Sequence, residues 1–124
     1  MVSCDKGIYM TNTLWFQNAV LELRRGVILI AVLTQLSTQK YGYALLKSLA
    51  EKGFELDQGT LYPLLRRLES QDLLDSSWKI EEGRPRRYYV INAEGKRALA
   101  RLSKEWAGLV TTMDGILSTD RRQK

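Results

Sequence analysis

The apolar positions in the first part of the chain recur at the spacing of an α-helix. Residues 14–23 carry a broad apolar face, wider than a helix on the surface of a small monomer needs, so we expect part of it to meet another subunit. Residues 27–36 repeat at helical spacing with the pattern of a buried helix. Gly26 between them weakens one continuous helix without forbidding it. Residues 1–12 show no clear period, and we expect a flexible tail there.

Two further helices follow after short polar connections. Residues 41–52 place their apolar side chains on one face, and residues 59–69, GTLYPLLRRLE, carry leucines at i, i+3, i+4 and i+7. Asp57 or Thr60 can cap the later helix. The choice matters because Pro63 is easily housed in the first turn of a helix and costly deeper inside.

After this helix the hydrophobic period changes from helical to alternating. Residues 74–80 and residues 89–91 are predicted to be the strands of a hairpin, with turn residues in EEGRPRR, residues 81–87, between them. A two-stranded hairpin is only marginally stable by itself. We therefore expect it to pack on the helices through Trp78 and Ile91. A helix-turn-helix followed by such a hairpin is the winged-helix plan.

A long helix is expected at the end of the chain, from a cap at Asn92 to about Ser118. Its apolar residues alternate steps of three and four, which is the pattern of a heptad seam. These residues are Leu99, Leu102, Trp106, Leu109, Met113 and Ile116. A helix of about 39 Å would leave this seam in water on an isolated chain. We expect it to pair with a second copy of the chain, helped by residues 14–23.

The charge balance favours a polyanionic partner. The 124 residues include 19 Lys and Arg against 14 Asp and Glu, which gives a net charge of +5. The exposed face of the 59–69 helix carries Arg66 and Arg67, and three more arginines lie at the hairpin tip. A basic helix beside a basic hairpin suits DNA, with the helix in the major groove and the hairpin on phosphates or the minor groove. A solvated surface helix and a solubilising turn remain the alternatives.

The composition argues against several other classes of protein. Histidine is absent, which removes the commonest general base and metal ligand, so we expect no enzyme, no metal site and no cofactor. Cys4 is the single cysteine, so no internal disulfide or thiolate cluster can form. The longest apolar run, residues 27–33, is too short to span a bilayer, and no secretory signal opens the chain. We therefore expect no membrane partner and a cytoplasmic location.

These elements define the predicted fold class: mainly α with a small β-hairpin, a winged helix-turn-helix followed by a long C-terminal dimerisation helix. Four segments make up the predicted organisation. Residues 1–12 are the tail, residues 13–92 the winged-helix DNA-binding domain, residues 93–118 the dimerisation helix and residues 119–124 a basic tail.

Several strings occur in one order along residues 15–117 and resemble the PadR family of transcriptional regulators, in its short form with a single C-terminal helix. They are ELRRGVILIAVL, YGYALLKSL, GTLYPLLRRLE, GRPRRYYVI and AEG. The resemblance implies a homodimeric DNA-binding repressor, usually relieved by a small molecule. It also implies that the second and third helices and the wing contact DNA. At the matching positions here are Tyr41, Tyr43, Thr60, Tyr62, Pro63, Arg66 or Arg67, Arg84, Arg86 and Arg87.

On this basis we expect two recognition helices to lie about 34 Å apart on a pseudo-palindromic operator in double-stranded DNA. Gln58, Thr60 and Tyr62, near the start of the recognition helix, are the expected base readers, and Lys79 and the wing arginines are expected to neutralise phosphates. A winged-helix module that binds an acidic protein surface instead of specific DNA is the alternative.

The resemblance also places Trp106 near the dimer centre, where some family members accept flat aromatic ligands. We expect a small aromatic effector to bind against Trp106, with other residues of the subunit interface around it. The interface set is Leu14, Trp15, Phe16, Leu99, Leu102, Trp106, Leu109, Met113 and Ile116. The alternative is that Trp106 is an ordinary residue of the dimer core.

Overall fold

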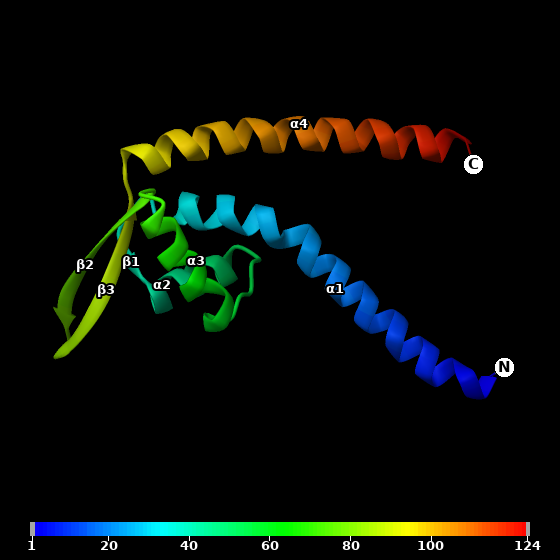
Figure 1. Ribbon diagram of the computed structural model, residues 1–124, viewed down its shortest axis with the longest axis horizontal. Coiled ribbons are helices and arrows are strands. Elements are labelled where there is room, and N and C mark those ends of the chain that lie inside the picture. The colour runs from blue at the N-terminus through cyan, green and yellow to red at the C-terminus, as the bar shows by residue number, and fades with distance from the viewer. Residues whose placement is uncertain (1, 124) are drawn as a thin grey trace.

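The structure, a computed structural model, describes the backbone of residues 2–123 and the side chains of residues 13–119 (Figure 1). Helices and a small antiparallel sheet make up the fold. In chain order the elements are α1 (Val2–Gln35), β1 (Lys40–Tyr41), α2 (Gly42–Glu51), α3 (Gln58–Ser70), β2 (Leu74–Glu81), β3 (Arg84–Ile91) and α4 (Ala93–Gln123). This is the predicted class, mainly α with a β-hairpin between the third and last helices.

Helix α1 is continuous where the sequence suggested a tail and an interruption. It begins at Val2, so the backbone of residues 2–12 is helical rather than irregular. Gly26 lies inside the helix in open surroundings. Once a helix is nucleated, each added residue gains a hydrogen bond for a small entropic cost, so an isolated glycine and a weakly patterned end are tolerated.

The core joins the C-terminal half of α1 to α2, α3 and the base of the hairpin. Most of its buried side chains are leucines, a composition that packs densely without leaving polar atoms unpaired. The buried residues are Val32, Leu33, Leu36, Leu45, Leu49, Leu61, Leu64, Leu65, Leu68, Leu74, Tyr89 and Ile91. All four leucines of the α3 stripe are among them, as the helical spacing predicted.

Asp57 is the residue that caps α3. Its carboxylate accepts a hydrogen bond of 2.8 Å from the backbone N–H of Thr60. Because α3 begins at Gln58, Pro63 lies in its second turn. A proline there has no N–H for the carbonyl four residues earlier, which is the costlier of the two placements considered. Burial of the leucine stripe offsets this cost.

The sheet has three strands in the order β1-β3-β2, not the two strands expected. Tyr41 belongs to β1, where it pairs with Tyr88, while its neighbour Lys40 pairs with Tyr89. Tyr41 was predicted to be the first residue of the second helix, but it is extended and stands just before α2. The short β1 strand adds one more connection between the hairpin and the start of α2.

The hairpin packs on the helices through its base and projects beyond them (Figure 1). Leu74 and Ile91 face each other across the two strands and are buried, as expected for Ile91. Trp78 shares the face of Leu74 but is 66% exposed, so the prediction that it packs on the helices is wrong. The strand alternation was identified correctly, but the core ends two residues before Trp78.

Helix α4 starts at a cap and then runs beside α1 before the two helices diverge (Figure 1). Asn92 accepts a hydrogen bond from the N–H of Gly95 at 2.8 Å, as a cap residue should. Gly95 fits closely against the backbone of Leu73, where a Cβ would collide. The helix continues to Gln123, past the end predicted near Ser118 and into the segment expected to be a basic tail.

Two residues of the predicted dimer seam also make contacts within the chain. Leu99 and Leu102 are partly buried against the core of their own subunit. They lie in the part of α4 that runs beside α1, so they are partly buried within a single chain. The later seam residues are not covered in this way.

Candidate nucleic-acid interface

The face of α3 opposite its buried leucines combines small side chains with one arginine. With 3.6 residues per turn, Gly59, Pro63, Arg66 and Ser70 lie opposite the buried leucines. Arg66 is exposed at the centre of this face. A glycine and a proline beside it let the helix backbone approach a flat partner closely, which suits the major groove.

Arg67 lies on the flank of α3 that faces α1. It lines a shallow hollow of about 220 Å³ together with Arg25 and Ile28 of α1. Thr60 and Pro63 line the same hollow from α3. The sequence left open whether Arg66 or Arg67 serves the interface, and the geometry favours Arg66.

The first turn of α3 offers polar side chains to solvent. Gln58 and Thr60 are exposed. The backbone N–H of Thr60 is engaged by the Asp57 carboxylate, and hydrogen bonds from Thr60 lower the pKa of Asp57. The carboxylate is thereby kept ionised at the positive end of the helix dipole. The Thr60 hydroxyl also interacts with this carboxylate, so of the two side chains it is Gln58 that is left available for base edges.

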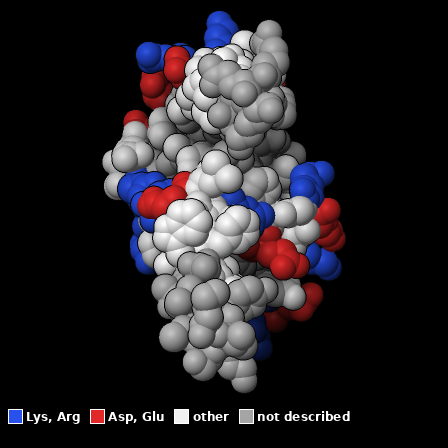
Figure 2. Space-filling model, turned by 90° about the vertical axis from the view of Figure 1, so that its right-hand side faces the viewer, with Lys and Arg blue, Asp and Glu red and all other residues white. Residues whose placement is uncertain are grey.

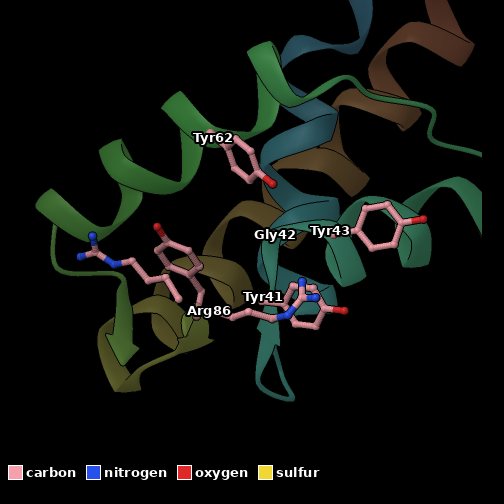
Figure 3. Close-up of a pocket in the computed structure, with 7 residues that line it drawn as sticks. Tyr41, Gly42, Tyr43, Tyr62 and Arg86 are labelled. Carbon is pink, nitrogen blue, oxygen red and sulfur yellow. The ribbon is translucent and has the colours of Figure 1, made fainter. Parts of the chain in front are cut away.

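A hollow of about 230 Å³ lies between the start of α2, α3 and the wing (Figure 3). Its lining includes Tyr41, Tyr43, Tyr62 and Arg86, residues that the sequence placed in the interface on three separate elements. Figure 3 shows the Tyr62 ring reaching from α3 toward Gly42, while Tyr43 points away from it. The structure therefore brings together residues that are separated by up to 45 positions in the sequence.

Gly42 is a site residue that the sequence analysis missed. A Cβ at this position would collide with the ring of Tyr62. Glycine is therefore needed here for a close approach rather than for an unusual backbone angle. The ring of Tyr62, expected to read bases, is partly buried across the start of α2.

The wing tip is a tight turn at Glu82 and Gly83. Both residues have positive φ, 52° and 77°, and the flanking pair Glu81 and Arg84 closes the hairpin. This is the backbone of a two-residue hairpin loop of type I′. The predicted turn over residues 81–87 is therefore shorter, and the arginines after it belong to β3.

Because side chains alternate along a strand, the arginines of β3 lie on different faces of the sheet. Arg86 stacks over the Tyr41 ring with 4.4 Å between its Cζ and the ring centroid. Lys79, opposite Arg86 in the register, lies over the Tyr88 ring at 5.1 Å. Tyr41 and Tyr88 themselves meet edge to face. The outer face of the sheet thus alternates cations and aromatic rings.

The cations of this outer face keep donors free for another molecule. The Nε of Arg86 is buried and cannot reach another molecule, so any phosphate contact must come from the outer nitrogens of its guanidinium. Lys79 donates one hydrogen bond to the side-chain oxygen of Gln39 at 2.5 Å, and the other two hydrogens of its ammonium group can bind another molecule. Arg84 is exposed beside the tip. These groups can neutralise phosphates along one edge of the wing.

Arg87 lies on the inner face and is held by its own chain. Its guanidinium binds both carboxylate oxygens of Glu69 at 3.0 and 2.9 Å, and its Nε donates to Ser76 Oγ at 3.1 Å. It was expected to face phosphates with the other wing arginines. Glu69 and Ser76 were not identified from the sequence. Recognising a two-residue turn at Glu82–Gly83 in the sequence would have given the strand register, which places Ser76 and Arg87 on one face of the hairpin. The contact of Glu69 with these two residues depends on the packing of α3 against the sheet and has no signal in the sequence.

Most of the residues assigned to a subunit interface form exposed apolar surfaces on α1 and α4. Leu14, Trp15 and Phe16 on α1 are more than half exposed. Exposed apolar residues continue along the second half of α4. They are Trp106, Leu109, Val110, Met113, Ile116 and Leu117. Figure 2 shows one side of the molecule, where uncharged side chains between the grey, undescribed residues have Lys, Arg, Asp and Glu among them and at the two sides.

Other kinds of site were sought within the described residues. Among the side chains of residues 13–119, no group of three or more Cys, Asp or Glu residues could hold a metal ion. No helix in the described part of the chain is long and apolar enough to cross a membrane. The predictions that fall on Cys4 and on the residues after Thr119 lie outside the described side chains.

A helix-turn-helix followed by a basic β-hairpin defines a winged-helix DNA-binding protein. Residues 29–101 match the transcriptional regulator PadR-like family. The fold is similar to the crystal structure of a PadR family transcriptional regulator from Eggerthella lenta DSM 2243, with a TM-score of 0.82 and 44% identity over 87% of this chain and 96% of that one. It is also similar to a PadR-like transcriptional regulator from Bacillus cereus, with a TM-score of 0.69 and 30% identity over 77% of this chain and 96% of that one.

Transcriptional regulator Rv3488 of Mycobacterium tuberculosis is 34% identical to this chain over 79 residues, which are 63% of this chain and 74% of that protein. The chain belongs to the PadR-like family of transcriptional regulators. Proteins of this family are regulators rather than enzymes, and they bind DNA, usually as dimers. The resemblance identified from five strings of the sequence is confirmed.

Proposed function

We propose that this regulator is a homodimer that binds a pseudo-palindromic operator and represses transcription until a small aromatic molecule releases it. One observation carries the proposal: the cationic residues of α3 and the wing lie at one end of the molecule, and the unpaired apolar faces of α1 and α4 lie toward the other (Figure 1). Such a separation lets two chains join without covering their DNA-binding surfaces.

Exposed apolar surface supports the dimer. A small monomer seldom exposes a large contiguous apolar patch. Trp15 and Phe16 on α1 and Met113 on α4 are exposed in one chain, together with their apolar neighbours. A second copy offers the same apolar residues, so a two-fold arrangement buries both sets at once.

Arg66 is proposed to provide the main base or phosphate contact of the recognition helix, because it is the exposed cation at the centre of the α3 face. Gln58 and Thr60 are proposed as additional base readers at its first turn. The wing contributes phosphate contacts through Lys79, Arg84 and Arg86. These roles divide the interface into a reading helix and a positioning hairpin.

Selection from a pool of random duplex DNA tests the proposed function. The wild-type protein is expected to enrich inverted half-sites whose centres are about 10 bp apart, or a multiple of this spacing. Arg66→Ala should weaken binding to the selected duplex about tenfold or more and relax the preference at one position of each half-site. Affinity is measured by fluorescence anisotropy at fixed salt.

Lys104→Ala is the matched control, because it removes one exposed positive charge from α4, away from the wing. It should leave the affinity for the selected duplex within about twofold. If no sequence is enriched, and the protein binds all duplexes alike, the chain does not read an operator. The proposal of a repressor would then fail, and an interaction with an acidic protein surface would become the better explanation of the basic face.

The proposed effector site lies between the subunits against Trp106, which is 45% exposed in the isolated chain. An indole that is neither buried in the core nor fully in water offers a flat apolar surface for stacking. A ligand bound there would favour one spacing of the two recognition helices. Only such a difference in affinity between the two arrangements can release DNA.

A further inference from the structure

Arg87, Glu69 and Ser76 form a closed ring of hydrogen bonds that joins three elements. Arg87 on β3 makes two bonds to the carboxylate of Glu69 on α3 and one to the hydroxyl of Ser76 on β2. Ser76 completes the ring by donating to Glu69. Two parallel bonds between a guanidinium and a carboxylate fix direction as well as distance. The ring therefore constrains the orientation of the hairpin relative to α3.

The surroundings of the ring hold Arg87 in place. Its guanidinium lies 5.8 Å from the centroid of the Trp78 ring and 5.7 Å from that of the Tyr89 ring. The exposed fractions of the Arg87 and Glu69 side chains are 39% and 28%. The hydrogen bond from Ser76 is the main factor that lowers the pKa of Glu69, with Arg87 adding to it and partial burial opposing it. Glu69 stays ionised at ordinary pH, and both charges are satisfied within the chain.

The position of the ring on the hairpin gives it mechanical importance. The base of the hairpin is buried through Leu74 and Ile91. The next pair on the same face, toward the hairpin tip, is Ser76 and Tyr89. Beyond this pair the hairpin extends into solvent, with Trp78 and Ile80 exposed. The ring thus stands where the hairpin leaves the body of the protein. A small rotation at this point would be amplified into a large displacement of the tip.

We propose that Arg87 is a positioning residue rather than a phosphate contact: its ring with Glu69 and Ser76 fixes the angle between the recognition helix and the wing, so that both reach their grooves on one duplex. The inference rests on the proposed function, because it concerns how the same interface is oriented. It separates Arg87 from Arg84 and Arg86, which are free to meet phosphates.

Glu69→Ala distinguishes positioning from charge neutralisation. This change removes a negative charge and releases Arg87, so a phosphate-contact role for Arg87 predicts that binding to all DNA becomes stronger. A positioning role predicts the opposite for the operator: about a tenfold loss of affinity for the selected duplex, with affinity for unrelated duplexes unchanged within about twofold. The ratio of the two affinities is the decisive quantity. Asp114→Ala on α4 removes a negative charge elsewhere and controls for net charge.

The salt dependence provides a second test that a merely structural role in stability would not affect. Arg87→Ala should lower operator affinity without changing the slope of log affinity against log salt, whereas Arg86→Ala should reduce that slope by about 1. Arg87→Lys keeps the charge but not the paired geometry, so it should not restore operator affinity. The double variant Glu69→Ala, Arg87→Ala should lose little more than either single variant, because the two residues act as a unit.

Each variant is first checked for a wild-type melting transition, and Arg87→Lys and Glu69→Gln serve where the alanine variants fail to fold. Stronger operator binding by Glu69→Ala, or a reduced salt slope for Arg87→Ala, overturns the inference while leaving the proposed function intact. A wild-type protein that selects no duplex overturns both. The expected pattern, a lost preference with an unchanged salt slope, supports Arg87 as the residue that sets the wing angle.

Discussion

The three arginines of the wing look equivalent in the sequence, but they have three different surroundings. Arg84 is exposed beside the tip, Arg86 stacks on an aromatic ring of the outer face, and Arg87 is bound to Glu69 on the inner face. The cause is the two-residue period of a strand, which sends Arg86 and Arg87 to opposite sides. Pro85 lies between Arg84 and Arg86 in β3, opposite Ile80 and beyond the short β1 strand, where its missing N–H costs no hydrogen bond to a neighbour.

Gly42 gives the sharpest prediction at the scale of one residue. Gly42→Ala should destabilise the protein by about 1 kcal/mol, since the collision with the Tyr62 ring costs about 1–3 kcal/mol and the better helix propensity of alanine returns part of it. The displaced ring should also change the hollow beside Arg86. The free energy of unfolding is measured by urea titration.

A double-mutant cycle shows whether Tyr62 is the cause. In a Tyr62→Ala background the collision is absent, so Gly42→Ala should be neutral or slightly stabilising there. Gly26→Ala, in open surroundings on α1, is the control for helix propensity alone and should stabilise. An equal loss from Gly42→Ala in both backgrounds would show that the ring of Tyr62 does not require glycine at this position.

At the scale of elements, α4 has two different environments along its length. Its first turns pack on the core through Leu99 and Leu102, and its later apolar residues remain exposed. The heptad pattern in the sequence is continuous and does not show where one environment ends. The boundary is set where α4 diverges from α1, because only the part of α4 beside α1 is packed against the rest of the chain (Figure 1).

Leu109→Glu is expected to convert the proposed dimer into monomers. A carboxylate buried without a partner in an apolar seam costs several kcal/mol, enough to weaken association about a hundredfold or more. The change lies on exposed surface in one chain, so the fold of the monomer should persist. Sedimentation equilibrium over a range of concentrations measures the association.

Thr111→Glu is the matched control, since Thr111 lies on the opposite side of the same helix by heptad spacing. It introduces the same charge and should leave the dimer intact. Equal weakening by both substitutions would mean that the seam is not the contact surface, and a monomeric wild-type protein would remove the two-fold operator from the proposed function.

At the scale of the whole molecule, the proposed DNA-binding surface and the proposed dimer surface are connected through α1. The C-terminal half of α1 is buried in the winged-helix core, and its exposed half carries Trp15 and Phe16. Between the two halves Arg24 stacks on Phe54 at 5.2 Å and donates to the carbonyl of Gly53. These contacts join the exposed half of α1, which carries the proposed dimer surface, to the loop between α2 and α3.

Tryptophan fluorescence titrated with planar aromatic compounds tests the proposed effector site. A compound that stacks on Trp106 should quench its emission and, at the same concentrations, reduce affinity for the selected duplex. Trp106→Phe identifies the signal, because Trp15 and Trp78 also emit. If no compound both quenches and releases DNA, Trp106 serves only the subunit contact.

Much of this arrangement was determined by the sequence alone. The leucine stripe of α3, the cap at Asn92, the alternation of the hairpin strands and five strings in family order led to a winged-helix regulator of the PadR-like family. These features are local: a helix period, a cap and a strand period depend on residues only a few positions apart.

The tertiary structure alone decided which of the candidate residues are free. It placed Tyr62 across Gly42, bound Arg87 to Glu69, turned Arg67 toward α1 and covered Leu99 and Leu102 while exposing Trp78. Each outcome depends on contacts between elements distant in the chain, and a side chain's local pattern does not specify which neighbour reaches it first. Burial and pairing follow from packing, so they could not be predicted from spacing along the sequence.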